Sequence, residues 1–191
     1  MEIHERPAYE PDKHGRATQI DVCAATTDDI EAIARIDEAR GKGSVEILVP
    51  RILASFERIA REEVRWHNFV ASVKGEVVGY AICRYHAWGE RNGDSGLPEG
   101  WYLAGLSVLP SHRRRGVGRS LTEHRITWVS ERTDVVYYTV AEANGPSIAL
   151  HEAVGLVEVA RGLVLSFPRR SEELHILGEK RLSGPDEDRR R

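Results

Sequence analysis

Three β-rich runs follow one another in the middle of the chain with no helical period between them. They span residues 69–73, 77–85 and 101–108, and a tight Lys-Gly turn at 74–75 joins the first two. Strands joined in this way pair antiparallel, so the three runs predict a meander. Pro110 closes the third run, because proline cannot continue a central ladder. We therefore expect a sheet that is largely antiparallel.

Helical periods lie on both sides of this meander, and a β-rich run at 19–25 comes before all of them. The expected helices lie within 28–41, 45–64, 116–131 and 147–154, and further strands are expected at 135–140 and 156–167. The late strand–helix–strand crossover implies one parallel pairing. The pattern predicts an α/β fold of the α+β type, with a mixed, mostly antiparallel central sheet of about six or seven strands and about four flanking helices.

The chain has 191 residues, of which 41% are hydrophobic, enough for one domain with a buried core. We expect a flexible N-terminal tail at 1–16, a folded domain at 17–168, and a charged, loosely ordered C-terminal tail at 169–191. Within that last segment, Leu174, Ile176 and Leu177 leave open a short docked piece.

Several classes of protein are disfavoured by composition. Lys and Arg total 27 against 30 acidic residues, a net charge of −3, whereas nucleic-acid binders normally carry a basic surplus. No apolar run is long enough for a membrane span, and the N-terminal residues do not resemble a secretory signal. The two cysteines, Cys23 and Cys83, are too few for a disulfide scaffold, and the eight histidines show no metal-binding spacing. We expect a cytoplasmic protein without a metal.

The chemistry is concentrated after the third β-rich run. There the chain passes through three arginines at 113–115 and then Gly116 and Gly118 into a helix. Glycines at a helix start let backbone N–H groups converge, and the helix dipole adds partial positive charge, which suits a phosphate or pyrophosphate. The segment is not a P-loop, because no Gly-Lys-Ser/Thr follows, and it lacks the first glycine of a dinucleotide fingerprint.

Two sequence motifs, which occur in the expected order along the chain, resemble motifs of one protein family. Arg113-x-x-Gly116-x-Gly118, after a strand that ends in proline, is similar to the coenzyme A pyrophosphate loop of the GNAT superfamily of N-acetyltransferases. The segment 144–156, an asparagine, a short helix and a Gly-hydrophobic step into the next strand, resembles a later motif of that family. The resemblance covers about residues 18–167 and implies acetyl-CoA as acetyl donor, an amine acceptor and direct acyl transfer.

The resemblance also implies roles for particular residues. Leu106 and Val108 fall where the family's strand splays to hold the pantetheine arm, and the Leu106 N–H would polarise the thioester carbonyl. Asn144 would reach the pantetheine from the neighbouring strand. The pyrophosphate would be wrapped by Arg113, Arg114, Arg115, Gly116, Val117, Gly118, Arg119 and Ser120.

The sequence departs from the family at two catalytic positions. His151 stands where the family usually has a tyrosine that protonates the leaving thiolate; imidazole could take that role, or the histidine could simply pack. Some members carry a glutamate base in the strand before the loop, and Tyr102 stands there here. The base would then be a water chain or Glu142, which is also readily explained as a solvated strand-end residue.

The acceptor and the oligomeric state stay open. A small-molecule amine is favoured over a protein N-terminus, and the acidic loop at 87–100 hints at a cationic amine. A homodimer is the family's common habit. One alternative is a sensor or interaction domain that binds acyl-CoA without turnover. Another is a phosphate-loop protein for a different nucleotide.

Overall fold

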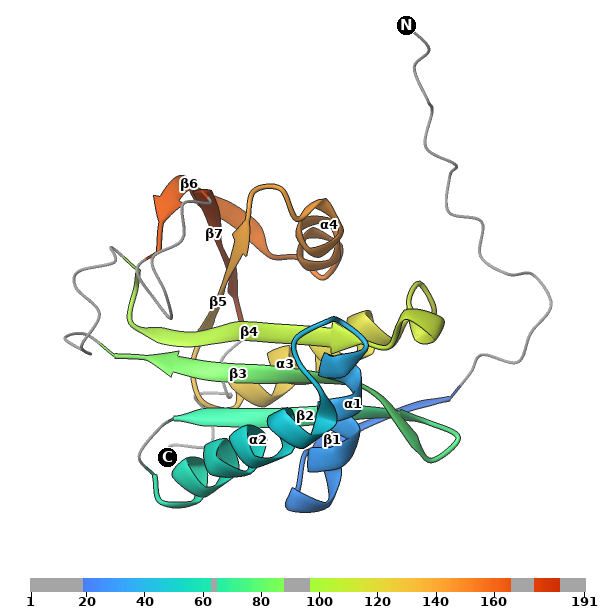
Figure 1. The fold of residues 1–191 in the computed structure, drawn as a ribbon. Coiled ribbons are helices and arrows are strands. Elements are labelled where there is room, and N and C mark those ends of the chain that lie inside the picture. The colour runs from blue at the N-terminus through green and yellow to red at the C-terminus, as the bar shows by residue number, and fades with distance from the viewer. Residues whose placement is uncertain (1–18, 63–64, 88–96, 166–173, 183–191) are drawn as a thin grey trace, which may run out of the picture.

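A seven-stranded sheet dominates the computed structural model, which describes residues 19–62, 65–87, 97–165 and 174–182 (Figure 1). The strands are β1 (Ile20–Ala24), β2 (Trp66–Val73), β3 (Glu76–His86), β4 (Gly100–Val108), β5 (Val135–Ala141), β6 (Val157–Val164) and β7 (Leu174–Arg181). The helices are α1 (Ile30–Glu38), α2 (Val45–Ala60), α3 (Val117–Ser130) and α4 (Gly145–Ala153), with short 3-10 turns η1 (Thr27–Asp29) and η2 (Pro110–His112).

The strands lie in the order β1-β2-β3-β4-β5-β7-β6, and β4 and β5 are the one parallel pair among these neighbours. The predicted meander is β2, β3 and β4, and the predicted crossover runs from β4 through α3 to β5. The expected fold class, a mixed and mostly antiparallel sheet with flanking helices, is confirmed.

The helices cover the two faces of the sheet because each has one apolar stripe. Val117, Leu121 and Val129 of α3 are buried in the main core beneath β2, β3 and β4. Ile33 and Ile36 of α1 pack with Tyr80 of β3 on the opposite face. Figure 1 shows α1 and α2 in front of the sheet and α3 behind it.

The C-terminal boundary expected at residue 168 is wrong, because β7 lies inside the sheet between β5 and β6. Its charged residues fall mainly at one end, where water reaches them, whereas Ile176 and Leu177 are buried. Gly178 faces Tyr138 of β5, and a Cβ at Gly178 would overlap that ring. A segment with many charged residues can therefore form an inner strand of a sheet when its central residues are apolar or small.

Other expectations fall on residues that the structure leaves undescribed. The N-terminal tail at 1–16 and most of the acidic loop at 87–100 are among them. Within the described ranges, no helix is both long and apolar enough to cross a membrane.

Candidate functional site

The two halves of strand β4 differ in what bonds their backbone. The first half pairs with β5 and is called the sealed half; in the second, the open half, side chains bond the carbonyls of Leu106 and Val108. Near its start, Tyr102 pairs with Tyr137 of β5, the one register pair of this parallel ladder. Farther along, side chains take the carbonyls that a strand would otherwise take. Arg40 Nη1 lies 3.4 Å from Leu106 O, and Arg113 Nε donates to Val108 O at 3.1 Å.

This pattern places the Leu106 and Val108 backbones at the open edge. The N–H and C=O of one strand residue point to the same side, so the Leu106 N–H lies on the edge that its carbonyl occupies. The backbone groups of Ser107 and Leu109 point the other way, toward β3. Ser107 pairs with Tyr80, and Leu109 N donates to Val78 O. The two residues expected at a splayed strand thus lie where β4 and β5 diverge.

A bulge in β4 begins this open half. The register with β3 shifts between Ala104 and Leu106, and Gly105, with φ 41°, is the inserted residue. Left-handed backbone favours glycine, and a Cβ at Gly105 would lie 3.3 Å from the Ile82 side chain. The bulge lies between Tyr102, which pairs with β5, and Leu106, whose carbonyl is bonded by Arg40.

A buried arginine that the sequence analysis did not assign to the site holds the bulge. Arg125 of α3 has no exposed surface, and its Nη1 donates to Ile82 O and to Ala104 O, each at 3.1 Å. Its Nε lies 3.3 Å from Leu121 O. Burial lowers its pKa to about 10. Its burial could have been predicted from the sequence, because Arg125 lies four residues from both Leu121 and Val129 and so falls on the apolar face of the helix.

The start of α3 adjoins this edge. Gly116 is the N-cap, with φ 89°, and Arg114, two residues before it, has φ 62°. No side chain caps the helix and no acidic residue lies in its first turn. Ser120 N bonds to Gly116 O, which leaves the N–H groups of the preceding turn without intrahelical acceptors. The exposed arginines at 113–115 lie just before this end, so free backbone N–H donors and positive charge occur together there.

Strand β4 and helix α4 both approach the glycine loop at Gly118. A Cβ at Gly118 would lie 3.6 Å from Leu106 Cδ2 of β4 and 3.6 Å from Leu150 Cδ2 of α4. Val117 beside it is buried in the core, whereas Arg119 is exposed and pairs with Glu123 at 2.7 Å. Leu106 of β4, the glycine loop and Leu150 of α4 are therefore neighbours at this point.

Asn144 begins α4 as its N-cap. Its Oδ1 accepts from Ser147 N at 3.3 Å, the usual way for asparagine to satisfy a helix start. This contact orients the Asn144 side chain at the end of β5, beside the divergence from β4.

His151 of α4 is 5% exposed and neutral in this environment. Its Nδ1–H donates to Ser147 O at 2.7 Å, and its ring stacks on Tyr138 with centroids 4.1 Å apart. Burial lowers its pKa to about 4, and the Arg125 cation acts in the same direction. Nε2 is buried and has no hydrogen-bond partner among the described residues. At neutral pH, Nε2 therefore holds a lone pair and cannot donate a proton.

Glu142 makes structural contacts. Its Oε1 accepts from Gly162 N of β6 at 2.9 Å, and its Oε2 lies 3.6 Å from Arg161 Nη1. These contacts hold β6 to the end of β5. They favour the strand-end interpretation of Glu142 over a role as base.

Tyr102 does not replace a carboxylate base. Its hydroxyl donates to Pro98 O at 2.7 Å, and burial raises its pKa far above neutrality. The ring belongs to the sealed half of β4, where it stacks with Tyr137 at 5.3 Å.

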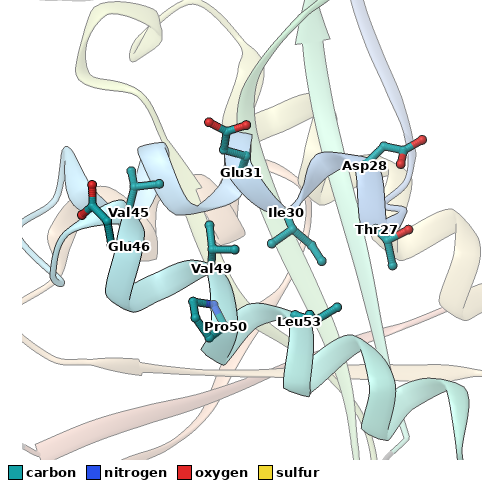
Figure 2. Close-up of a pocket in the computed structure, with 9 residues that line it drawn as sticks. All are labelled: Thr27, Asp28, Ile30, Glu31, Val45, Glu46, Val49, Pro50 and Leu53. Carbon is teal, nitrogen blue, oxygen red and sulfur yellow. The ribbon is translucent and has the colours of Figure 1, made fainter.

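A groove lies away from this site. It has a volume of about 600 Å³ between α1 and α2 and is shown in Figure 2. Its floor includes Ile30, Val49 and Leu53, and its rim carries Glu31 and Glu46. None of the β4, α3 or α4 residues lines it. Across the described part of the chain, His, Cys, Asp and Glu side chains form no group that could hold a metal ion.

Comparison with known proteins identifies the family. The family model described as acetyltransferase (GNAT) family matches residues 34–156, well over half of the chain. This range includes the open edge of β4, the glycine loop and His151.

Curated relatives match over part of their length. The N-alpha-acetyltransferase of Sulfurisphaera tokodaii is 35% identical over 95 residues, which cover 48% of this chain and 56% of the relative. The aminoglycoside N(6')-acetyltransferase type 1 of Klebsiella aerogenes is 32% identical over 90 residues, 46% of this chain and 56% of the relative. The chain spans a little over half the length of these relatives.

Solved structures share the fold over most of the chain. The ribosomal-protein-alanine N-acetyltransferase of Brucella melitensis has a TM-score of 0.65 at 25% identity and covers 84% of this chain and 99% of its own. An acetyltransferase of Salmonella typhimurium, solved with acetyl-CoA, has a TM-score of 0.61 at 21% identity and covers 87% and 96%. The resemblance carried by the two sequence motifs is thus confirmed, and the chain belongs to the acetyltransferase (GNAT) family.

Proposed function

We propose that this protein transfers an acetyl group from acetyl-CoA to a primary amine by direct attack. The observation that carries the proposal is the open half of β4, whose Leu106 backbone lies beside the uncapped start of α3. Family membership supports the reaction type. The relatives named above acetylate different amines, and a small-molecule acceptor is the class that we favour.

The glycine loop would hold the pyrophosphate of the coenzyme. Backbone N–H groups from Gly116 to Ser120 supply directed donors, and the arginines at 113–115 add charge-assisted contacts. The pantetheine would pair with the backbone of Leu106 and Val108 in place of a strand. Arg113 Nε would then exchange its bond to Val108 O for a phosphate oxygen or stay as a brace.

The chemical step needs a neutral amine. Its nitrogen attacks the acetyl carbon, the C–S bond breaks, the coenzyme leaves as a thiolate, and the nitrogen loses one proton. The Leu106 N–H would stabilise the oxyanion as it forms, an interaction on the scale of about 3 kcal/mol for one such donor.

We do not assign the proton transfers to His151 as acid or to Glu142 as base. Neutral His151 cannot protonate the thiolate from Nε2, and Glu142 is held by β6. We therefore assign both proton transfers to water. Asn144 would contact the pantetheine arm, and His151 would keep its packing position against Tyr138.

A titration of the protein with acetyl-CoA tests the proposal. Saturating ligand should raise the unfolding temperature, because a ligand at a hundredfold excess over its Kd stabilises the folded state by about 2.7 kcal/mol. Gly116→Val should weaken binding at least about tenfold, since a β-branched residue disfavours the left-handed start of the helix. Gly75→Val is the matched control, because Gly75 has φ 83° in the distant β2–β3 turn.

Release of free thiol from acetyl-CoA with a panel of amines then tests turnover. Binding with no turnover of any amine would support the acyl-CoA sensor instead. No binding at all, or competition by ATP or NAD, would overturn the proposed function.

A further inference from the structure

A cationic side chain faces the open edge of β4 from the α1–α2 loop. Arg40 Nη1 lies 3.4 Å from Leu106 O and also donates to Ser107 Oγ. The guanidinium is therefore within one residue of the N–H that the proposed function assigns to the thioester carbonyl. Figure 1 shows this loop crossing the end of β4 on the face opposite α3.

Arg40 has a fixed support. Asp37, which is buried, accepts from Tyr80 Oη at 2.7 Å and pairs with Lys42 Nζ at 2.9 Å. Glu38 Oε1 accepts from Val45 N at 3.1 Å, which closes the loop onto the start of α2. These contacts hold both ends of the segment that carries Arg40.

The charge of Arg40 is not balanced by its contacts. Its partners are a backbone carbonyl and a serine hydroxyl, and none of the ion pairs within the described ranges includes it. The two carboxylates at the end of α1 are engaged elsewhere, Asp37 with Lys42 and Glu38 with the Val45 N–H. A guanidinium has five N–H donors, and Arg40 is exposed.

The face on which Arg40 lies is the one left for the acceptor. The proposed coenzyme contacts come from the start of α3 and from α4. Ser107 points to the opposite face, as do Tyr80 and Ile82, which pack with α1. An amine that reaches the acetyl carbon from this side passes the guanidinium.

We propose that Arg40 binds a carboxylate of the acceptor, so that the substrate is an amino acid or another amine with a carboxylate close to its nitrogen. The inference rests on the proposed function. A planar guanidinium matches a carboxylate through two parallel N–H···O bonds, and such a pair would fix the amine next to the thioester. The same cation repels polycationic amines. This is the opposite of the acceptor suggested by the acidic loop, of which Glu99 accepts from Tyr85 Oη.

Matched acceptors test the inference. L-amino acids and their carboxamides are each offered with acetyl-CoA, and thiol release gives kcat/KM for each pair. In Arg40→Gln, kcat/KM should fall about 10- to 100-fold for the acids, the effect of losing a charge-assisted hydrogen bond, and far less for the amides. Arg40→Lys should recover part of the loss. Arg51→Gln, an exposed arginine on α2, is the matched control and should change neither.

Three results would overturn the inference. The first is an equal loss for acids and amides in Arg40→Gln, which would mark a structural role through Leu106. The second is acetylation of amides or simple amines but of no acid. The third is no acetylation of either class by a protein that binds acetyl-CoA, which would leave the coenzyme site intact. Failure to bind acetyl-CoA would instead bring down the proposed function, and this inference with it.

Discussion

The two halves of β4 satisfy their backbone in different ways. In the first half, Tyr102 pairs with β5 and its ring stacks on Tyr137. In the second half, Arg40 and Arg113 take the carbonyls of Leu106 and Val108. A strand partner is held by the whole sheet, whereas a guanidinium on a flexible stem can give way to a ligand. One strand thus combines a fixed anchor with an edge that can exchange partners, and Gly105 separates the two.

The largest expected effect comes from removing the support of the bulge. Arg125→Met should destabilise the fold by about 3 kcal/mol, because Ile82 O and Ala104 O lose the donor that the structure gives them. Chemical denaturation measures this change. Arg51→Met, an exposed substitution of the same kind, should cost less than about 0.5 kcal/mol. Equal stability of the two variants would mean that the bulge holds its shape without Arg125.

The next effect is a pH dependence of the unfolding free energy that comes from His151 of α4. His151 has a pKa of about 4 in the folded protein, against 6.5 for an unperturbed histidine. The unfolded chain therefore binds more protons between these values, and stability falls as pH falls from about 6.5 to 4, by about 3 kcal/mol in total.

Unfolding free energies of the wild type and His151→Phe, measured from pH 7 to pH 4, check this expectation. The variant should lack that part of the slope. Parallel curves for the two proteins would show that His151 titrates normally and is not enclosed as described.

The smallest effect is expected in the sealed half. Tyr102→Phe removes the hydrogen bond to Pro98 O and keeps the stacked ring, so it should cost about 1 kcal/mol of stability. Once an acceptor is known, kcat/KM should be unchanged. Tyr85→Phe, whose hydroxyl bonds to exposed Glu99, is the control for losing a tyrosine hydroxyl. A large loss of activity at unchanged stability would place Tyr102 in the chemistry.

Much of this arrangement could be predicted from the sequence because it depends on local signals. β-rich runs joined by a Lys-Gly turn mark β2 and β3, Pro110 ends β4, and Gly116 begins α3. Each of these follows from the conformational limits of a few neighbouring residues. The roles of Leu106 and Val108 followed from the family resemblance alone, and they stay predictions.

The remainder depended on contacts between distant segments. Arg40 and Leu106 are 66 positions apart, and no local pattern links them. The tautomer of His151 depends on burial against Tyr138 and on the Ser147 carbonyl. The many charges around β7 led to the prediction of a loosely ordered tail. The strand is instead held by contacts with a distant segment, among them Gly178 against Tyr138.

The position of β7 has a consequence for how the protein is made. β7 is the last of the described strands to leave the ribosome, yet it lies between β5 and β6. Until it arrives, β5 presents an unpaired edge and β6 has no neighbour in the sheet. Strand β6 therefore cannot join the sheet until residues 174–181 have been synthesised. Translation that stalls before this strand would leave a nascent chain with a meander already paired and an exposed edge open to aggregation.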